Sequence, residues 1–127
     1  MTAHQGFQFD ATGFLKDAIS RVDCSNGIDV FTDDKEYVKS KFLGILKERS
    51  ENTRIIQQVN PAIDLVKSAL YRTKIIWNST FAYWSAYINN AYFKENQKNI
   101  IVPRSFAKEC GDGKSFHLNT RWTILEY

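Results

Sequence analysis

The sequence predicts an α+β fold in which four or five helices pack on a small antiparallel sheet that includes the C-terminal strand. Apolar residues recur at helical spacing from about residue 10 to about residue 93, whereas the last segment, over residues 115–124, alternates with the two-residue period of a strand. The chain has 127 residues and lacks repeats, low-complexity tracts and Pro/Gly/Ser-rich linkers. One globular domain over residues 1–127 is therefore expected.

The first predicted helix follows a short strand or anchored arm in which Phe7 and Phe9 alternate. Asp10 or Thr12 can cap its first turn, because both side chains accept hydrogen bonds from free backbone N–H groups. Apolar residues then recur at helical spacing as far as Val22. A Ser-Asn-Gly sequence ends the helix.

The next predicted elements are a short strand over residues 28–31 and a helix from about Asp34 to Arg49. Asp33 and Glu36 stand three residues apart, as in a capping box at a helix start. A short helical piece is expected over 55–59. The core stripe of the longer helix is predicted from Val38, Phe42, Ile45 and Leu46.

Two further helices are predicted, one from Pro61 to Trp77 and an aromatic one after Asn78-Ser79. Tyr83 and Tyr87 form a second row beside the core stripe of the aromatic helix, and we expect them to be partly exposed. The predicted core stripe of the Pro61 helix is Ile63, Val66, Leu70, Thr73 and Trp77. The predicted core stripe of the aromatic helix is Phe81, Trp84, Ile88 and Ala91.

The C-terminal region is predicted to hold a strand at residues 100–102, a short helix at 105–110, a Gly-Asp-Gly turn and the final strand. One side of the final strand should face the core, including Trp122 and Ile124. The other side is polar.

That polar side carries the candidate catalytic residues His117, Asn119 and Arg121, successive members lying about 6.6 Å apart along a strand. Such a trio could span a phosphodiester in a ribonuclease-type toxin, with Arg121 on the phosphate, His117 transferring a proton and Asn119 orienting an oxygen. The simpler interpretation, which we favour, is the solvated side of a half-buried strand, since polar alternation is expected there.

Composition argues against several other classes of protein. Hydrophobic residues make up 43% and charged residues 24%, as in a globular chain. Cys24 and Cys110 have no metal-ligand spacing, so we expect no metal and no cofactor. The N-terminus lacks a basic-then-apolar signal, and no apolar run approaches a membrane span, which predicts a cytoplasmic protein without membrane contact.

The charge distribution predicts the kind of partner. The net charge is +3, and residues 34–74 hold nine basic and five acidic residues. Arg49, Arg54 and Arg72 lie in this region and suit contact with another protein that has an acidic surface. Nucleic acid is the alternative partner, although the chain lacks dense Lys/Arg clusters.

We therefore expect a small non-catalytic binding or inhibitor protein, of the toxin-neutralising (immunity protein) or defence-blocking type. The predicted contact residues combine aromatic area with positive charge. The alternatives are the ribonuclease-type toxin and a nucleic-acid-binding module. The predicted contact residues are Tyr83, Tyr87, Arg49, Arg54 and Arg72.

Overall fold

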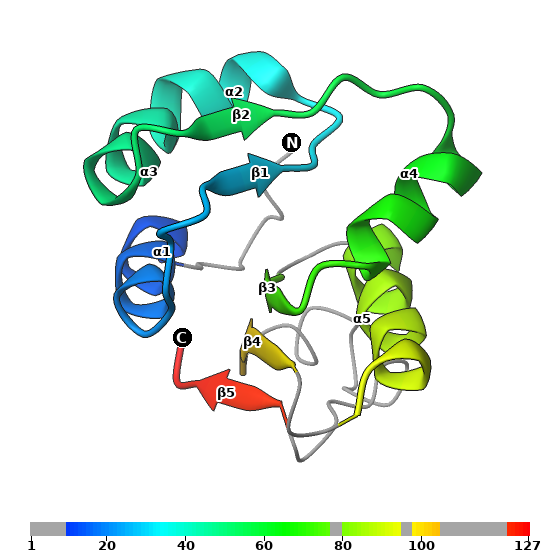
Figure 1. The fold of residues 1–127 in the computed structure, drawn as a ribbon. Helices are drawn as coiled ribbons and strands as arrows, with labels where there is room; N and C mark the ends of the chain where they lie inside the picture. The colour runs from blue at the N-terminus through cyan, green and yellow to red at the C-terminus, as the bar shows by residue number, and fades with distance from the viewer. Residues whose placement is uncertain (1–9, 77–79, 95–97, 105–121) are drawn as a thin grey trace, which may run out of the picture. The chain divides into compact units, whose positions relative to one another are not determined.

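The computed structural model of the chain describes residues 10–76, 80–94, 98–104 and 122–127 (Figure 1). Backbone contacts divide the chain into two compact units, residues 1–61 and residues 62–127. Each unit has its own small sheet. The two units are described separately below.

The first unit is built around a two-stranded parallel sheet. Strands β1 and β2 pair so that Asp29 lies opposite Arg54. The Arg54 guanidinium donates two hydrogen bonds to the Asp29 carboxylate, at 3.0 and 2.9 Å. The chain crosses between the strands through two helices, because parallel neighbours need a long connection. The elements are α1 (Ala11–Ser20), β1 (Ile28–Val30), α2 (Lys35–Lys41), α3 (Leu43–Arg49) and β2 (Thr53–Ile55).

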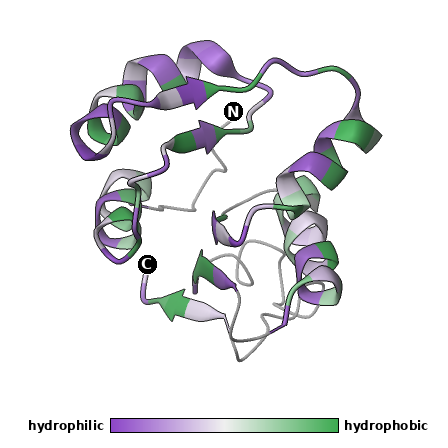
Figure 2. Cartoon of the chain, viewed as in Figure 1, coloured by the Kyte–Doolittle hydropathy of each residue, from purple (hydrophilic) through white to green (hydrophobic). Residues whose placement is uncertain are grey.

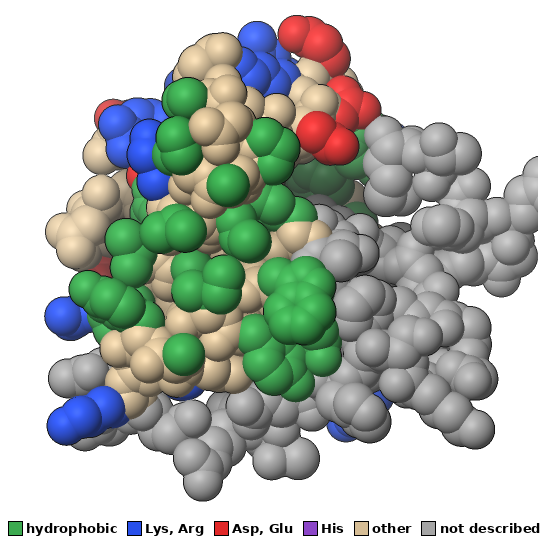
Figure 3. Space-filling model, turned by 90° about the vertical axis from the view of Figure 1, so that its right-hand side faces the viewer, with side chains coloured by type: hydrophobic (Ala, Val, Ile, Leu, Met, Phe, Trp, Pro, Cys, Tyr) green, Lys and Arg blue, Asp and Glu red, His purple; other side chains and the backbone are tan. Residues whose placement is uncertain are grey.

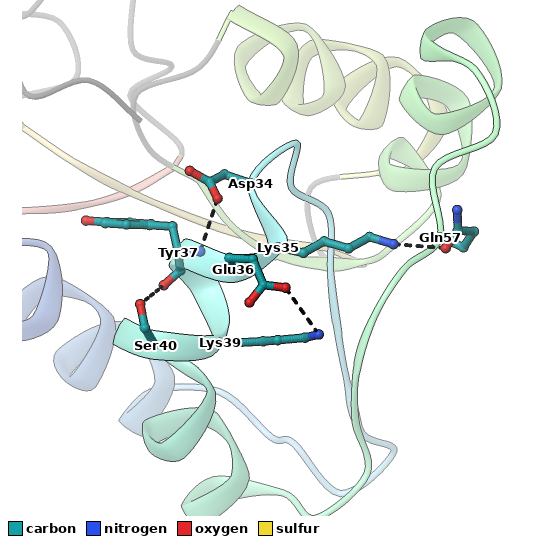
Figure 4. Close-up of polar contacts among 7 residues, drawn as sticks. All are labelled: Asp34, Lys35, Glu36, Tyr37, Lys39, Ser40 and Gln57. Carbon is teal, nitrogen blue, oxygen red and sulfur yellow. Dashed lines mark hydrogen bonds and ion pairs between the residues drawn. The ribbon is translucent and has the colours of Figure 1, made fainter.

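Aspartate caps begin the first two helices. Asp10 accepts a hydrogen bond from the Gly13 backbone N–H at 2.8 Å, which confirms one of the two predicted caps of α1. At α2 the cap is Asp34, which accepts from the Tyr37 N–H at 3.1 Å (Figure 4). The predicted capping box at Asp33 is therefore one residue early.

The predicted long helix over residues 34–49 is two helices. Phe42 breaks it, with φ −123° and ψ −23°, and serves both as the last cap of α2 and the first cap of α3. Its N–H still donates to the Val38 carbonyl, and its own carbonyl accepts from the Leu46 N–H. Val38, Phe42 and Leu46 are all buried, so the predicted core stripe survives the break except at Ile45, which is half-buried.

The second unit contains a three-stranded parallel sheet with β4 in the centre, in the order β3-β4-β5. The core cluster of this unit brings β4 and α5 together with Trp122, which confirms that Trp122 is buried. The elements are α4 (Pro61–Ala69), β3 (Thr73–Ile75), α5 (Thr80–Tyr92), β4 (Asn99–Pro103) and β5 (Thr123–Leu125). The cluster consists of Ile76, Tyr83, Ala86, Ile100, Val102 and Trp122.

The general α+β class is confirmed, but the predicted antiparallel sheet is wrong. All three pairs of neighbouring strands are parallel. Strand 73–75 lies inside the expected Pro61 helix, and strand 53–55 was not predicted: it overlaps the expected helical piece at 55–59 only at Ile55. Recognising 73–75 as a strand makes β3, α5 and β4 a crossover unit, and such a unit has parallel strands.

Candidate binding surface

Helix α4 and the residue that follows it expose three large apolar side chains. Ile63, Val66 and Leu70 are 43%, 52% and 46% exposed, whereas Asp64 and Ser68 are buried. Figure 2 shows strongly hydrophobic and hydrophilic residues alternating along this helix. The helical period predicted from the sequence is therefore correct up to the end of α4, but the expectation that these apolar residues face the core is wrong.

Polar contacts explain why this side of α4 faces inward. The Ser68 hydroxyl lies 2.8 Å from the Ser85 hydroxyl of α5. The Asn89 side-chain amide, also on α5, donates to the carbonyls of Ala69 and Tyr71 at 2.9 and 2.5 Å. Ala69 is the last residue of α4 and its carbonyl has no partner within the helix, so the bond from Asn89 satisfies it. Burying this polar side leaves the apolar side of α4 for the surface.

Lys74 on β3 binds a carbonyl in the last turn of α4. Its ammonium donates to the Ser68 carbonyl at 2.5 Å, and a cation at a helix C-terminus also complements the helix dipole. Burial lowers the pKa of Lys74 to about 8, because the charged form loses hydration. Lys74 therefore connects β3 to the end of α4.

Helix α5 is rotated relative to the prediction. Its buried residues include Tyr83, Ser85 and Asn89, whereas Trp84 is 53% exposed and Tyr92 is 68% exposed. The predicted core stripe of this helix is thus wrong at Trp84 and also at Ala91, which is exposed. Ser85 and Asn89 interact with the end of α4, and this contact sets the rotation.

Tyr83 and Tyr87 pack against Trp122. The ring centroids of Tyr83 and Tyr87 are 4.8 Å apart, and those of Tyr87 and Trp122 are 5.6 Å apart. The hydrogen bond to Tyr83 raises the pKa of Tyr87 to about 12. Tyr83 is buried, contrary to expectation, and Tyr87 is half-buried. A role for the two residues in partner binding stays a prediction.

The exposed apolar residues of α4 and α5 form a surface that we call the outer strip. Figure 3 shows hydrophobic side chains gathered on the side of the second unit where these helices lie. Cations accompany them: Lys67, Arg72 and Lys94 are exposed. Asp64 is the single acidic residue in the sequence from Pro61 to Lys94, and it is buried. The outer strip comprises Ile63, Val66, Leu70, Trp84 and Tyr92.

The three arginines predicted to bind a partner each have an intramolecular contact. Arg49 donates to the carbonyls of Ile19 and Val22 at 3.1 and 2.8 Å, which closes the end of α1. Arg54 pairs with Asp29 across the first sheet, and the Arg72 guanidinium lies 5.6 Å from the centroid of the Phe93 ring. Their contribution to partner binding stays a prediction.

The predicted catalytic residues His117, Asn119 and Arg121 lie outside the described residues. Among the residues that the structure does describe, no group of three or more His, Cys, Asp and Glu side chains is placed to hold a metal ion. Cys24 is buried, and burial raises the pKa of its thiol. None of the described helices has the length and hydrophobicity needed to cross a bilayer.

No protein family, curated protein or solved structure matches this chain. Function must therefore be inferred from the surface itself. The sequence did contain a signal for the outer strip: Ser85, Asn89 and Asn90 interrupt the apolar pattern in the middle of α5. Such residues inside a helix disfavour it unless a tertiary hydrogen bond compensates, so they mark the side that contacts another element.

Proposed function

We propose that the protein is a non-catalytic binding protein that contacts another protein through the outer strip. The observation that carries this proposal is the inverted helix α4, which buries Asp64 and Ser68 and exposes Val66 by 52%. A surface helix of a globular protein normally places its apolar stripe on the core. Gathered apolar side chains on a surface mark interaction sites, and exposed Trp and Tyr are enriched at protein interfaces.

The cations beside the strip support a partner with an acidic surface. Lys67 follows Val66 directly, and the exposed cations Arg72 and Lys94 lie on the segments that carry the strip. Complementary charge at the edge of an interface accelerates association and rejects wrong partners. By covering the working surface of its partner, the protein would act as an inhibitor of the toxin-neutralising or defence-blocking type.

Capture from the source cells tests the proposal. The tagged full-length chain is compared with a Val66→Glu variant, and Thr12→Glu is the matched control because it makes the same charge change at an exposed position of α1. We expect one stoichiometric protein to be captured by the wild type and the control and to be lost with Val66→Glu. The thermal midpoint of all three should agree within a few degrees.

Two results would contradict the proposal. Retention of the same partner by a folded Val66→Glu variant would show that the outer strip is not the contact surface. Capture of RNA in place of a protein would favour the nucleic-acid-binding alternative.

A further inference from the structure

We infer that the partner presents an amphipathic helix with acidic flanks, which lies along α4 in the manner of a short coiled coil. This inference rests on the proposed function and specifies the partner of the same surface. Ile63 and Val66 of α4, with Leu70 directly after its last residue, are spaced by three and then four residues, which is the spacing of the apolar seam between two coiled-coil helices. All three side chains are exposed at between 43% and 52%.

The positions around this seam determine the charge of the partner helix. Lys67 occupies the position directly after Val66, which in a coiled coil flanks the seam and pairs with an opposite charge on the other helix. Asp64, the one acidic residue of this stretch, has only 4% of its surface exposed and so offers little to a basic partner. Glutamate or aspartate beside the partner's apolar residues is therefore the complementary arrangement.

The same charges argue against a second copy of this chain as the occupant. A symmetric contact would place the cations Lys67, Arg72 and Lys94 of one copy against the same positively charged surface of the other copy. Like charges brought together at an interface cost binding free energy, and the strip offers no exposed acidic side chain to offset them. A different, acidic protein segment is the occupant that fits.

Helix α5 adds exposed aromatic side chains to the surface that the partner helix would contact. Trp84 and Tyr92 are separated by eight residues, so they lie about two turns apart along α5 and their directions differ by about 80° around the helix. The Ser68–Ser85 contact holds α4 against α5, one residue away from Trp84. Large, rigid aromatic side chains beside an apolar seam supply contact area at low entropic cost.

Titration of the full-length protein with designed peptides tests this inference. The probe is a fluorescein-labelled peptide of about three heptads with Leu at the seam positions and Glu at the flanking positions. One twin carries Lys in place of Glu, and a second has the acidic composition in scrambled order. Fluorescence anisotropy should show that the acidic amphipathic peptide binds at least about tenfold more tightly than either twin. Its circular dichroism should show added helix on binding.

Variants locate the site on the protein. Val66→Glu should abolish peptide binding, and Lys67→Glu should reduce the preference for the acidic peptide over its Lys twin. Thr12→Glu should change neither. Raising the salt concentration should narrow the difference between the acidic and the Lys peptide, because screening weakens charge pairing.

The outcomes separate this inference from the proposed function. Equal binding of the acidic and Lys peptides, equal binding of the scrambled peptide, or no peptide binding would overturn the helix inference. If Val66→Glu nevertheless releases a captured protein, the proposed function stands alone. Binding to phosphatidylserine vesicles that is lost with Val66→Glu, without peptide binding, would assign the strip to a membrane surface and overturn both. Concentration-dependent dimerisation that Val66→Glu abolishes would assign the strip to a second copy and overturn the inference.

Discussion

The hydroxyl groups of Ser68 on α4 and Ser85 on α5 lie 2.8 Å apart, and both side chains are buried. The Ser68 hydroxyl also donates to the Leu65 carbonyl at 2.9 Å, which leaves its oxygen to accept a hydrogen bond from Ser85. The contact turns the polar side of α4 towards α5. It is therefore part of the reason that Val66 and its apolar neighbours face outward.

We expect the two serines to be energetically coupled. Ser68→Ala and Ser85→Ala should each lower the free energy of unfolding by about 1 kcal/mol, since a neutral hydrogen bond contributes about that much. The double variant should cost less than the sum of the single variants, because either change already removes the contact. Urea denaturation measures all three, and Ser40→Ala is the control at an exposed serine. Strict additivity would show that the contact does not stabilise the protein.

The sequence was sufficient to locate elements that have local signals. Helix α1 has an aspartate cap at Asp10 and four apolar residues at helical spacing that the structure buries, and Val22, just beyond the end of the helix, is buried as well. Strand β1 follows a Gly-containing turn, where Gly27 adopts a φ of 104°. These features depend on neighbours in the sequence, so the sequence alone can reveal them.

The side of a helix that faces the core was not predictable in the same way. In α4 the apolar residues outnumber the polar ones, so periodicity assigned Ile63 and Val66 to the core. The structure instead buries Ser68, whose partners lie on α5 and β3. The prediction of antiparallel strands was wrong for a related reason. A strand of three residues, such as 73–75, has too short a pattern to be distinguished from helix, so the parallel crossover that it begins was missed. Both errors concern contacts between distant segments.

The buried Lys74 should make the protein more stable as the pH rises above about 8. Burial lowers its pKa in the folded protein from the ordinary value of 10.5 to about 8. Between these values the unfolded chain binds more protons than the folded one, so the free energy of unfolding should increase with pH. Below about pH 8 both states are protonated, and Lys74 contributes no slope. The slope should stay below about 1.4 kcal/mol per pH unit.

Urea denaturation at a series of pH values, from neutrality to about pH 9.5, measures this effect, since tyrosine ionisation begins to contribute near pH 10. Lys74→Met should remove the rise. If the variant keeps the same slope, another group causes it and the lowered pKa of Lys74 is not responsible.

Arg49 is expected to matter for folding. Its guanidinium donates to the carbonyls of Ile19 and Val22 at the end of α1, so Arg49→Gln should cost about 1–3 kcal/mol of unfolding free energy. Lys47→Gln makes the same charge change on α3 at an exposed position and should cost less than about 0.5 kcal/mol. Equal midpoints for the two variants in thermal unfolding would contradict this role.

The expected role of Arg49 in folding limits how electrostatic steering of a partner can be tested. Replacing Arg49, Arg54 and Arg72 by Glu should slow association with an acidic partner, but the Arg49 change also weakens the fold. Lys67→Glu and Lys94→Glu test steering separately from the Arg49 contact with α1, because both side chains are exposed in the second unit. We expect a lower association rate in stopped-flow mixing and a weaker dependence on salt. An unchanged rate would exclude steering by these two residues.

Tyr83 should control the ionisation of Tyr87. The hydrogen bond between them raises the pKa of Tyr87 to about 12, so Tyr83→Phe should return it towards the ordinary value of 10.0. Ultraviolet absorbance titration of the phenolate measures the shift as one additional tyrosine that ionises at lower pH. Tyr92→Phe is the control, since Tyr92 is 68% exposed. A titration curve that Tyr83→Phe leaves unchanged, apart from the loss of one phenol, would contradict the contact.

Substitutions in the C-terminal segment distinguish the binding-protein hypothesis from the nuclease hypothesis. The outer strip lies on other residues than His117 and Arg121, so His117→Ala and Arg121→Ala should leave both the fold and the captured partner unchanged. A positioned proton-transfer group contributes about 10²–10⁴ in rate, so a nuclease would lose its activity with His117→Ala.

Trp122→Ala, one residue after Arg121, is the comparison variant in the same segment: unlike His117→Ala and Arg121→Ala, it should destabilise the fold. Trp122 is 5% exposed, packs against Tyr83 and Tyr87, and donates from its indole to the Asn90 side chain at 3.2 Å. Its loss should cost about 3–5 kcal/mol, because it leaves a large cavity and removes the Asn90 hydrogen bond. RNA cleavage by the purified protein, lost with His117→Ala in a variant that melts normally, would replace the binding proposal with the ribonuclease alternative.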